Sequence, residues 1–133
     1  MKKISQIVLS LTLVMFLSAC GSNEGVYFAN LEDGAEVGTT FKVEMGVNGM
    51  EVEPAGEVVK GKGHHHIVID GTFIPTATMV PADEKNIHYG KGQTETELTL
   101  TPGEHTLTLQ FANGLHQSYG EEWSKTIKIT VKD

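Results

Sequence analysis

The sequence has no arginine and only one cysteine among its 133 residues. Without arginine, the chain lacks the planar guanidinium group that binds phosphates and base edges through two parallel hydrogen bonds. Beyond residue 19, eight lysines stand against 17 acidic residues, which gives a formal charge of −9. A surface this acidic repels nucleic-acid phosphates and attracts cations. Nucleic acid is therefore not an expected partner.

The first segment of the chain has the pattern of an export signal. Lys2-Lys3 precede an apolar run over residues 4–17 that is too short to span a bilayer comfortably as a mature helix. The run ends in LSAC at residues 17–20, which resembles the lipobox of bacterial lipoproteins. In such proteins the peptide is cut before the cysteine, whose thiol then carries a diacylglycerol. The resemblance predicts a signal peptide over residues 1–19 and a lipidated Cys20.

The lipid on Cys20 would attach the protein to a membrane of the cell envelope. Because Gly21 follows the cysteine, the known sorting rule of lipoproteins predicts the outer membrane in a cell with two membranes. In a cell with one membrane, the protein would face outward from the plasma membrane. Residues 20–25 are expected to form a tether and residues 26–133 a single domain. With one cysteine, no internal disulfide can stabilise that domain.

The domain shows no helical periodicity, whereas several segments alternate apolar and polar residues as β-strands do. Residues 94–101 and 105–111 are two such segments, and Pro102-Gly103 between them predicts a hairpin. Six or seven short strands separated by Gly/Pro turns indicate an all-β fold. We expect an antiparallel, immunoglobulin-like β-sandwich of about seven strands. The long irregular stretches 71–93 and 112–123 are candidates for functional loops.

Four runs of the sequence carry a family resemblance: FKVEMGVNGMEVEPAG, GKGHHHIVIDG, IHYGKGQTETELTL and PGEHTLTLQFANGLHQSY. Together they resemble the bacterial family catalogued as domain of unknown function 4399, over about Val26 to Val131. The resemblance implies an exported protein and no established activity. Relatives often have a His-x-His pair where this chain has Asn86-Ile87-His88. All six histidines lie within the matching runs.

A metal site is one interpretation of these histidines. His64 and His66 share one face of a strand, about 6.5 Å apart at the backbone, so their imidazoles can converge on one cation. A third and a fourth ligand would come from His88 and His116, one in each long loop, with His105 a weaker candidate. Imidazoles suit zinc, copper or nickel, and the lack of cysteine ligands argues against thiolate zinc sites. The ligands must be neutral, so affinity is expected to fall as the pH drops through about 6.5.

Methionines could add a soft ligand for Cu(I), and Met45, Met50 and Met79 are the candidates in the domain. Their spacing from the histidines does not predict a copper chaperone. Zinc or copper is the cofactor that the sequence suggests.

A structural role is the alternative interpretation. His65 shares the opposite strand face with Ile67 and Ile69, and His105 shares a face with Leu107 and Leu109. Such histidines are expected to support the fold, and all six could instead order the loops through hydrogen bonds. The protein would then be a structural or interaction module that binds a protein or a glycan.

Catalysis is not predicted. Asp70 with His66, or Ser118 with His116, can be drawn as reactive pairs. No third orienting group or nucleophile elbow accompanies either pair in the sequence. We therefore expect a binding protein rather than an enzyme.

Overall fold

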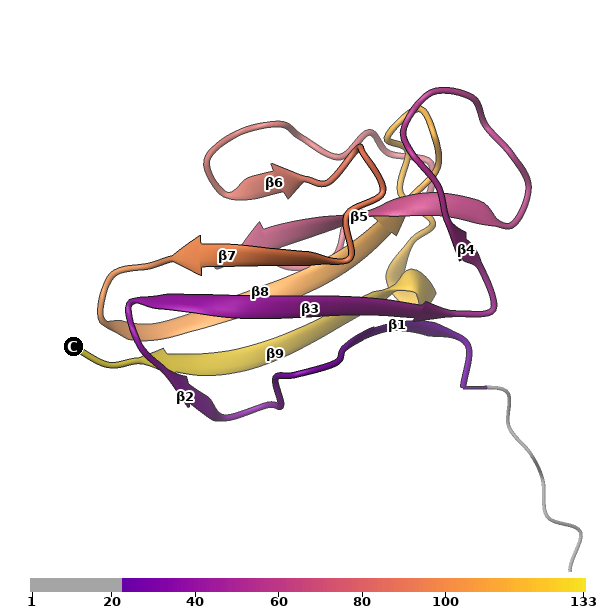
Figure 1. The fold of residues 1–133 in the computed structure, drawn as a ribbon. Helices are drawn as coiled ribbons and strands as arrows, with labels where there is room; N and C mark the ends of the chain where they lie inside the picture. Colours follow the sequence, from indigo (N-terminus) through magenta and orange to yellow (C-terminus); the bar gives the residue numbers. More distant parts are fainter. Residues whose placement is uncertain (1–22) are drawn as a thin grey trace, which may run out of the picture.

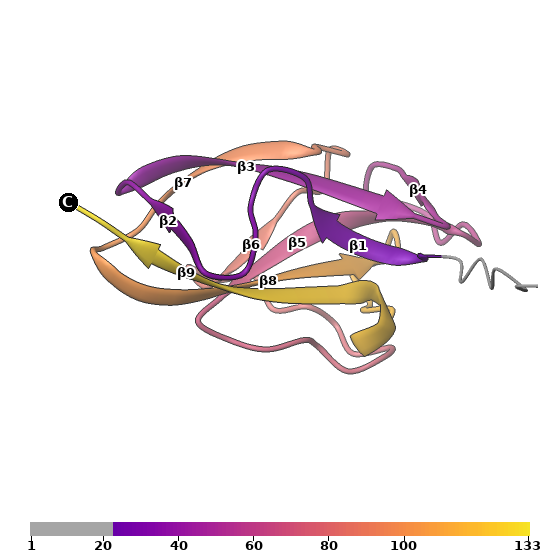
Figure 2. The ribbon, with the colours of Figure 1, turned by 90° about the horizontal axis from the view of Figure 1, so that it is seen from below.

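A computed structural model describes residues 23–133, which form two β-sheets packed against each other (Figures 1 and 2). The predicted signal peptide over residues 1–19 and the predicted lipidation site Cys20 lie outside the described residues. One sheet has the strand order β1-β3-β7, and the other has the order β2-β9-β8-β5-β4, with β6 also paired to β5. The elements are β1 (Gly25–Phe28), β2 (Ala35–Val37), β3 (Thr40–Asn48), β4 (Glu51–Val52), β5 (Lys62–Ile69), β6 (Asn86–His88), β7 (Glu95–Thr99), β8 (Gly103–Ala112), the short 3-10 helix η1 (Glu121–Trp123) and β9 (Ser124–Val131).

The predicted all-β sandwich is confirmed. The described residues contain nine strands rather than about seven, and two of the additional strands pair in parallel, β2 with β9 and β4 with β5. The larger sheet is therefore mixed. These two strands are only three and two residues long, too short to show an alternating pattern in the sequence.

The core lies between the two sheets and comes from the strands whose alternation was visible in the sequence. On β3, Phe41, Val43 and Met45 are buried, with polar or less buried residues between them. On β8, every residue from Leu107 to Ala112 is buried. Each large apolar side chain removed from water contributes about 1.5–3 kcal/mol to folding. The sandwich thus has an apolar core without any disulfide.

The predicted hairpin between residues 94–101 and 105–111 is wrong. β7 pairs with β3, whereas β8 pairs with β5 and β9, so the chain crosses from one sheet to the other between Thr99 and Gly103. Each strand has one apolar face, and placing the strands in opposite sheets lets Leu98 and Leu107 both enter the core. A turn signal shows where the chain changes direction but does not show which sheet the second strand joins.

Strand β5 lies inside the larger sheet and is buried on both faces from Gly63 to Ile69. β8 pairs with one of its edges, and β6 pairs with the other. Figure 2 shows the segment that follows β5 running along the outer face of this sheet. It is fastened there by hydrogen bonds from the Ile74 amide to Gln110 Oε1, 2.9 Å, and from Thr108 Oγ1 to the Gly71 carbonyl, 3.1 Å. This cover accounts for the burial of the histidine-bearing outer face.

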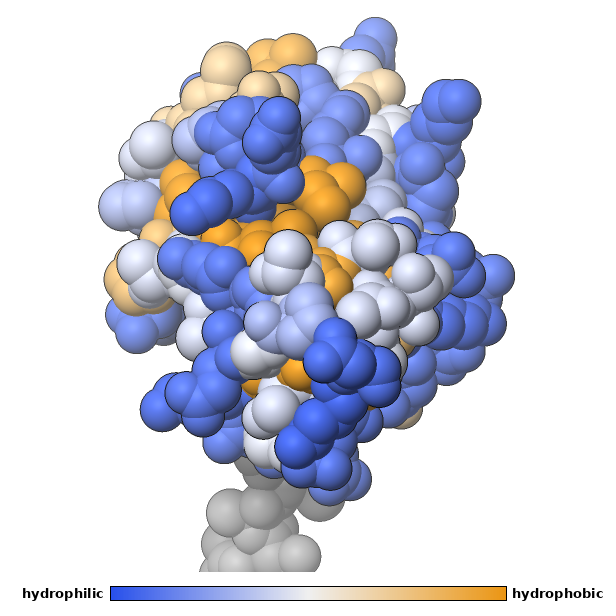
Figure 3. Space-filling view, turned by 90° about the vertical axis from the view of Figure 1, so that its left-hand side faces the viewer, coloured by the Kyte–Doolittle hydropathy of each residue, from blue (hydrophilic) through white to orange (hydrophobic). Residues whose placement is uncertain are grey.

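The surface at one end of the molecule is largely hydrophilic. Figure 3 views the molecule from the end at which β9 terminates, and hydrophilic side chains surround a smaller apolar area there. Within residues 23–133, no helix is long and apolar enough to cross a bilayer.

Candidate metal site

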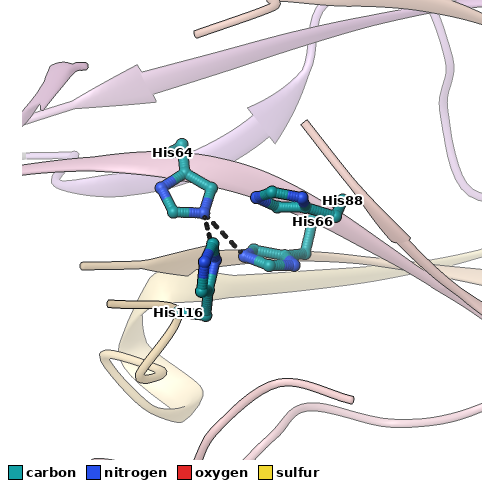
Figure 4. A group of neighbouring side chains, drawn as sticks. All are labelled: His64, His66, His88 and His116. Carbon is teal, nitrogen blue, oxygen red and sulfur yellow. Dashed lines mark hydrogen bonds between the residues drawn. The ribbon is translucent and has the colours of Figure 1, made fainter. Parts of the chain in front are cut away.

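Four histidines from three segments of the chain meet on the outer face of the larger sheet (Figure 4). His64 and His66 extend from the same face of β5, as the two-residue period of a strand requires. His88 is the last residue of β6, and the strand register places it directly opposite His66. His116 lies in the connection between β8 and β9. The expectation that His88 belongs to a loop is therefore wrong. The sequence did not reveal this strand, because three residues are too few to show an alternating pattern.

The imidazole nitrogens of the cluster converge. His66 Nε2 lies 3.0 Å from His64 Nε2, which lies 3.1 Å from His116 Nδ1. One ring nitrogen from each of the four histidines lies within 4.8 Å of the others. Four nitrogens bound tetrahedrally to zinc at about 2.0–2.1 Å would be about 3.3 Å apart. The two contacts of 3.0 and 3.1 Å are thus close to the spacing in a tetrahedral zinc site.

Hydrogen bonds between the imidazole rings cannot satisfy all of these converging nitrogens. A nitrogen of a neutral imidazole either donates its one proton or accepts through its one lone pair. His64 Nε2 has two ring nitrogens within hydrogen-bond distance, so it can make a strong hydrogen bond to only one of them. A cation among the four rings would instead accept a lone pair from each of them.

Burial keeps the central imidazoles neutral. It lowers the pKa of His64 to about 4 and that of His66 to about 3, and repulsion from neighbouring histidines acts in the same direction. Burial also lowers the pKa of His88, and His116 adds to the effect. Neutral imidazole is the form that binds metals. His64, His66 and His88 are therefore in their metal-binding protonation state at neutral pH.

The Nδ1 atoms of His64 and His66, which face away from the cluster contacts, lack a common feature of metal sites. Nδ1 of His64 and Nδ1 of His66 are buried and have no hydrogen-bond partner among the described residues. In most metal sites, the second nitrogen of a ligand histidine donates to a carboxylate or a carbonyl. These imidazoles are therefore oriented by packing and by one another.

The loop that carries His116 is held in a defined shape. His116 has a φ of 65°, a conformation uncommon for residues other than glycine. The side-chain Oδ1 of Asn113 accepts hydrogen bonds from the amides of Leu115 and Gln117. The carbonyl of His116 accepts a hydrogen bond of 2.9 Å from the Val80 amide. These contacts fix the backbone from which the fourth imidazole reaches the cluster.

A pocket of about 390 Å³ connects the cluster to the surface. His64 is fully buried and does not line this pocket, whereas His88 is exposed. The pocket is lined by His66, Met79, Val80, Pro81, Ala82, His88 and His116. An ion could therefore reach the histidines without unfolding the domain.

The other two histidines lie apart from the cluster. His65 points into the core, where its ring lies 5.0 Å from that of Phe111, and burial lowers its pKa to about 4. His105 Nδ1 lies 3.0 Å from Asp70 Oδ2, and its Nε2 lies 2.8 Å from the Thr101 carbonyl. The hydrogen bond to Asp70, followed by that to Thr101, raises the pKa of His105. Both ring nitrogens of His105 are thus occupied by acceptors from the protein.

The two reactive pairs considered from the sequence are not formed. Asp70 contacts His105 rather than His66. The Ser118 hydroxyl donates a 2.6 Å hydrogen bond to the carbonyl of Ile74 rather than to His116. Neither side chain is positioned as a partner of a cluster histidine.

The fold and the cluster define an all-β sandwich domain with a histidine group that could hold a metal ion. The model of a family described as a domain of unknown function (DUF4399) matches residues 43–132. The chain belongs to this family, as its sequence motifs predicted.

Comparison with other proteins adds little on activity. No curated protein matches the chain. Among solved structures, the endo-beta-1,4-mannanase from Thermotoga petrophila is similar, with a TM-score of 0.48 and 17% sequence identity. The similarity covers 83% of this chain and 20% of that chain, so the present chain spans about a fifth of the enzyme.

Proposed function

We propose that this protein is a lipid-anchored, non-catalytic envelope protein that binds a transition-metal ion, zinc or copper, through His64, His66, His88 and His116. The observation that carries the proposal is the convergence of four imidazole nitrogens within 4.8 Å at the end of a pocket. The lowered pKa values of His64 and His66 support it, because they keep these two imidazoles neutral. The acidic surface supports it further by raising the local concentration of cations.

Titration of untagged protein with zinc or copper, followed by calorimetry, tests the site. We expect one ion per chain, and His66→Ala should weaken binding at least about tenfold, or about 1.4 kcal/mol, because one of four nitrogens is lost. His105→Gln is the matched control, since it removes a histidine outside the cluster, and it should leave the affinity unchanged. Because the pKa values of His64 and His66 are lowered to about 4 and 3, binding should persist well below pH 6.5, where unperturbed histidines would release the ion.

The same titration separates metal binding from the alternative of an interaction module. The contact between His64 and His116 joins the β8–β9 connection to β5, so the cluster could serve only to order that loop. If wild-type protein and the His64→Ala, His66→Ala double variant bind metal equally weakly, the metal site does not exist. The histidines would then serve only to order the loops of a domain that recognises a protein or a glycan.

The membrane anchor rests on the sequence motif at residues 17–20. We expect Cys20→Ser to release the protein from the membrane fraction, because no thiol remains to carry the lipid. Fractionation should find the variant in the soluble fraction, and its intact mass should show loss of the acyl groups. Unchanged membrane association and unchanged mass in the variant would rule out lipidation at this position.

A further inference from the structure

Met79 is the one sulfur-containing side chain that lines the histidine pocket within the described residues, and it shares that pocket with His66, His88 and His116. Met79 is 63% exposed, whereas the adjacent Val80 is 4% exposed. The exposed thioether thus lies on the solvent side of the cluster, where an entering ion would pass.

The backbone holds Met79 close to the loop of His116. Met79 forms an isolated antiparallel bridge with Gln117, the residue after His116. The Val80 amide donates to the His116 carbonyl at 2.9 Å, and the Ser118 amide donates to the Thr78 carbonyl at 2.9 Å. Met79 is therefore fixed at its backbone, while its unbranched side chain keeps three rotatable bonds with which to reach the pocket.

The chemistry of the donors discriminates among metals. The cluster consists of imidazoles and contains no carboxylate or thiolate, so it contributes no negative charge. Thioether sulfur is a soft ligand that favours Cu(I), whereas zinc in proteins is bound by thiolate, imidazole and carboxylate. A methionine beside neutral imidazoles matches the preferences of copper in its monovalent form.

We infer that the ion bound by this site is copper, held as Cu(I) by the histidine cluster with the thioether of Met79 as an additional ligand from the pocket side. This inference rests on the proposed metal-binding function and narrows it to one metal. Met79 would contribute to the affinity for Cu(I) and contribute nothing to the affinity for zinc.

Anaerobic competition with a chromophoric Cu(I) chelator, in parallel with zinc competition, tests the role of Met79. Met79→Leu preserves an apolar side chain of similar volume and removes only the sulfur. We expect it to weaken Cu(I) binding about tenfold and to leave zinc binding within about twofold. Met50→Leu is the matched control: Met50 packs against the core and does not line the pocket, so its loss should alter neither affinity.

X-ray absorption at the copper edge provides an independent measurement. Wild-type protein loaded with Cu(I) should show a copper–sulfur distance that is present in Met50→Leu and absent in Met79→Leu. Equal Cu(I) affinity in wild type and Met79→Leu, or a copper shell of nitrogen alone, would overturn the assignment of Met79. That outcome differs from failure of the proposed function, in which the wild type binds neither zinc nor Cu(I) through its histidines.

Discussion

The metal-free domain is expected to be stable at neutral pH and to unfold on mild acidification, near pH 5. Burial lowers the pKa of His64 and His65 to about 4 and that of His66 to about 3. In the unfolded chain each would titrate near 6.5. Above pH 6.5 neither state binds these protons, so stability is at its full value. As the pH falls toward 4, the unfolded chain takes up protons that the folded domain excludes, and stability is lost.

The size of this effect is comparable to the whole stability of a small domain. Three protons, each worth about 1.4 kcal/mol per pH unit, give a slope of about 4 kcal/mol per unit between pH 6.5 and 4. At pH 5 the loss is roughly 6 kcal/mol, whereas small domains are typically stable by about 5–15 kcal/mol. The apolar core between the sheets maintains the fold at neutral pH, because none of the four cluster histidines belongs to it.

Urea unfolding of chelator-treated protein, followed by circular dichroism from pH 7.5 to 5, measures this slope. Most carboxylates titrate below this range, so histidines dominate the change within it. The double variant His64→Gln, His66→Gln should retain only about a third of the slope, since one of the three buried imidazoles remains. A free energy of unfolding that stays constant from pH 7.5 to 5 would show that these imidazoles are not buried in neutral form.

The sequence predicted the parts of the fold that follow from two-residue periodicity. Alternation identified the apolar faces of β3, β8 and β9, and it correctly placed His64 and His66 on one side of β5 with His65 on the other. It could not assign β7 and β8 to different sheets, because local pattern does not determine strand pairing. Short edge strands such as β2 and β4 carry too few residues to show any period.

The convergence of the cluster depends on tertiary structure. His88 comes opposite His66 through the register of a three-residue strand, and His116 reaches the cluster from a loop shaped by Asn113. His88 and His116 were candidates at the level of sequence only because they lie in the two long irregular stretches. Met79 had no useful spacing signal, because its proximity to the site depends on a bridge to Gln117, 38 positions further along the chain. The residue type of the cluster could thus be predicted from sequence, whereas its geometry could not.

Replacing His65 with leucine is expected to stabilise the domain. His65 is fully buried, packs edge-on against Phe111, and has no hydrogen-bond partner for either ring nitrogen among residues 23–133. A buried polar group without a partner costs about 1–3 kcal/mol. Leucine has a similar size and no polar atom, so His65→Leu should raise the free energy of unfolding at pH 7.5 by about 1–3 kcal/mol. Urea unfolding of the metal-free protein at this pH gives the value directly.

The gain from His65→Leu should increase in acid. At pH 5, removing one histidine with a lowered pKa avoids a further loss of about 2 kcal/mol, so the variant should unfold at a lower pH than wild type. Metal affinity should not change, because His65 points to the core while the cluster lies on the opposite face of β5. His105→Leu is the contrasting control: it removes a histidine bonded to Asp70 and Thr101 and should destabilise the domain. A destabilised His65→Leu variant would mean that this imidazole makes a polar contact essential to the core.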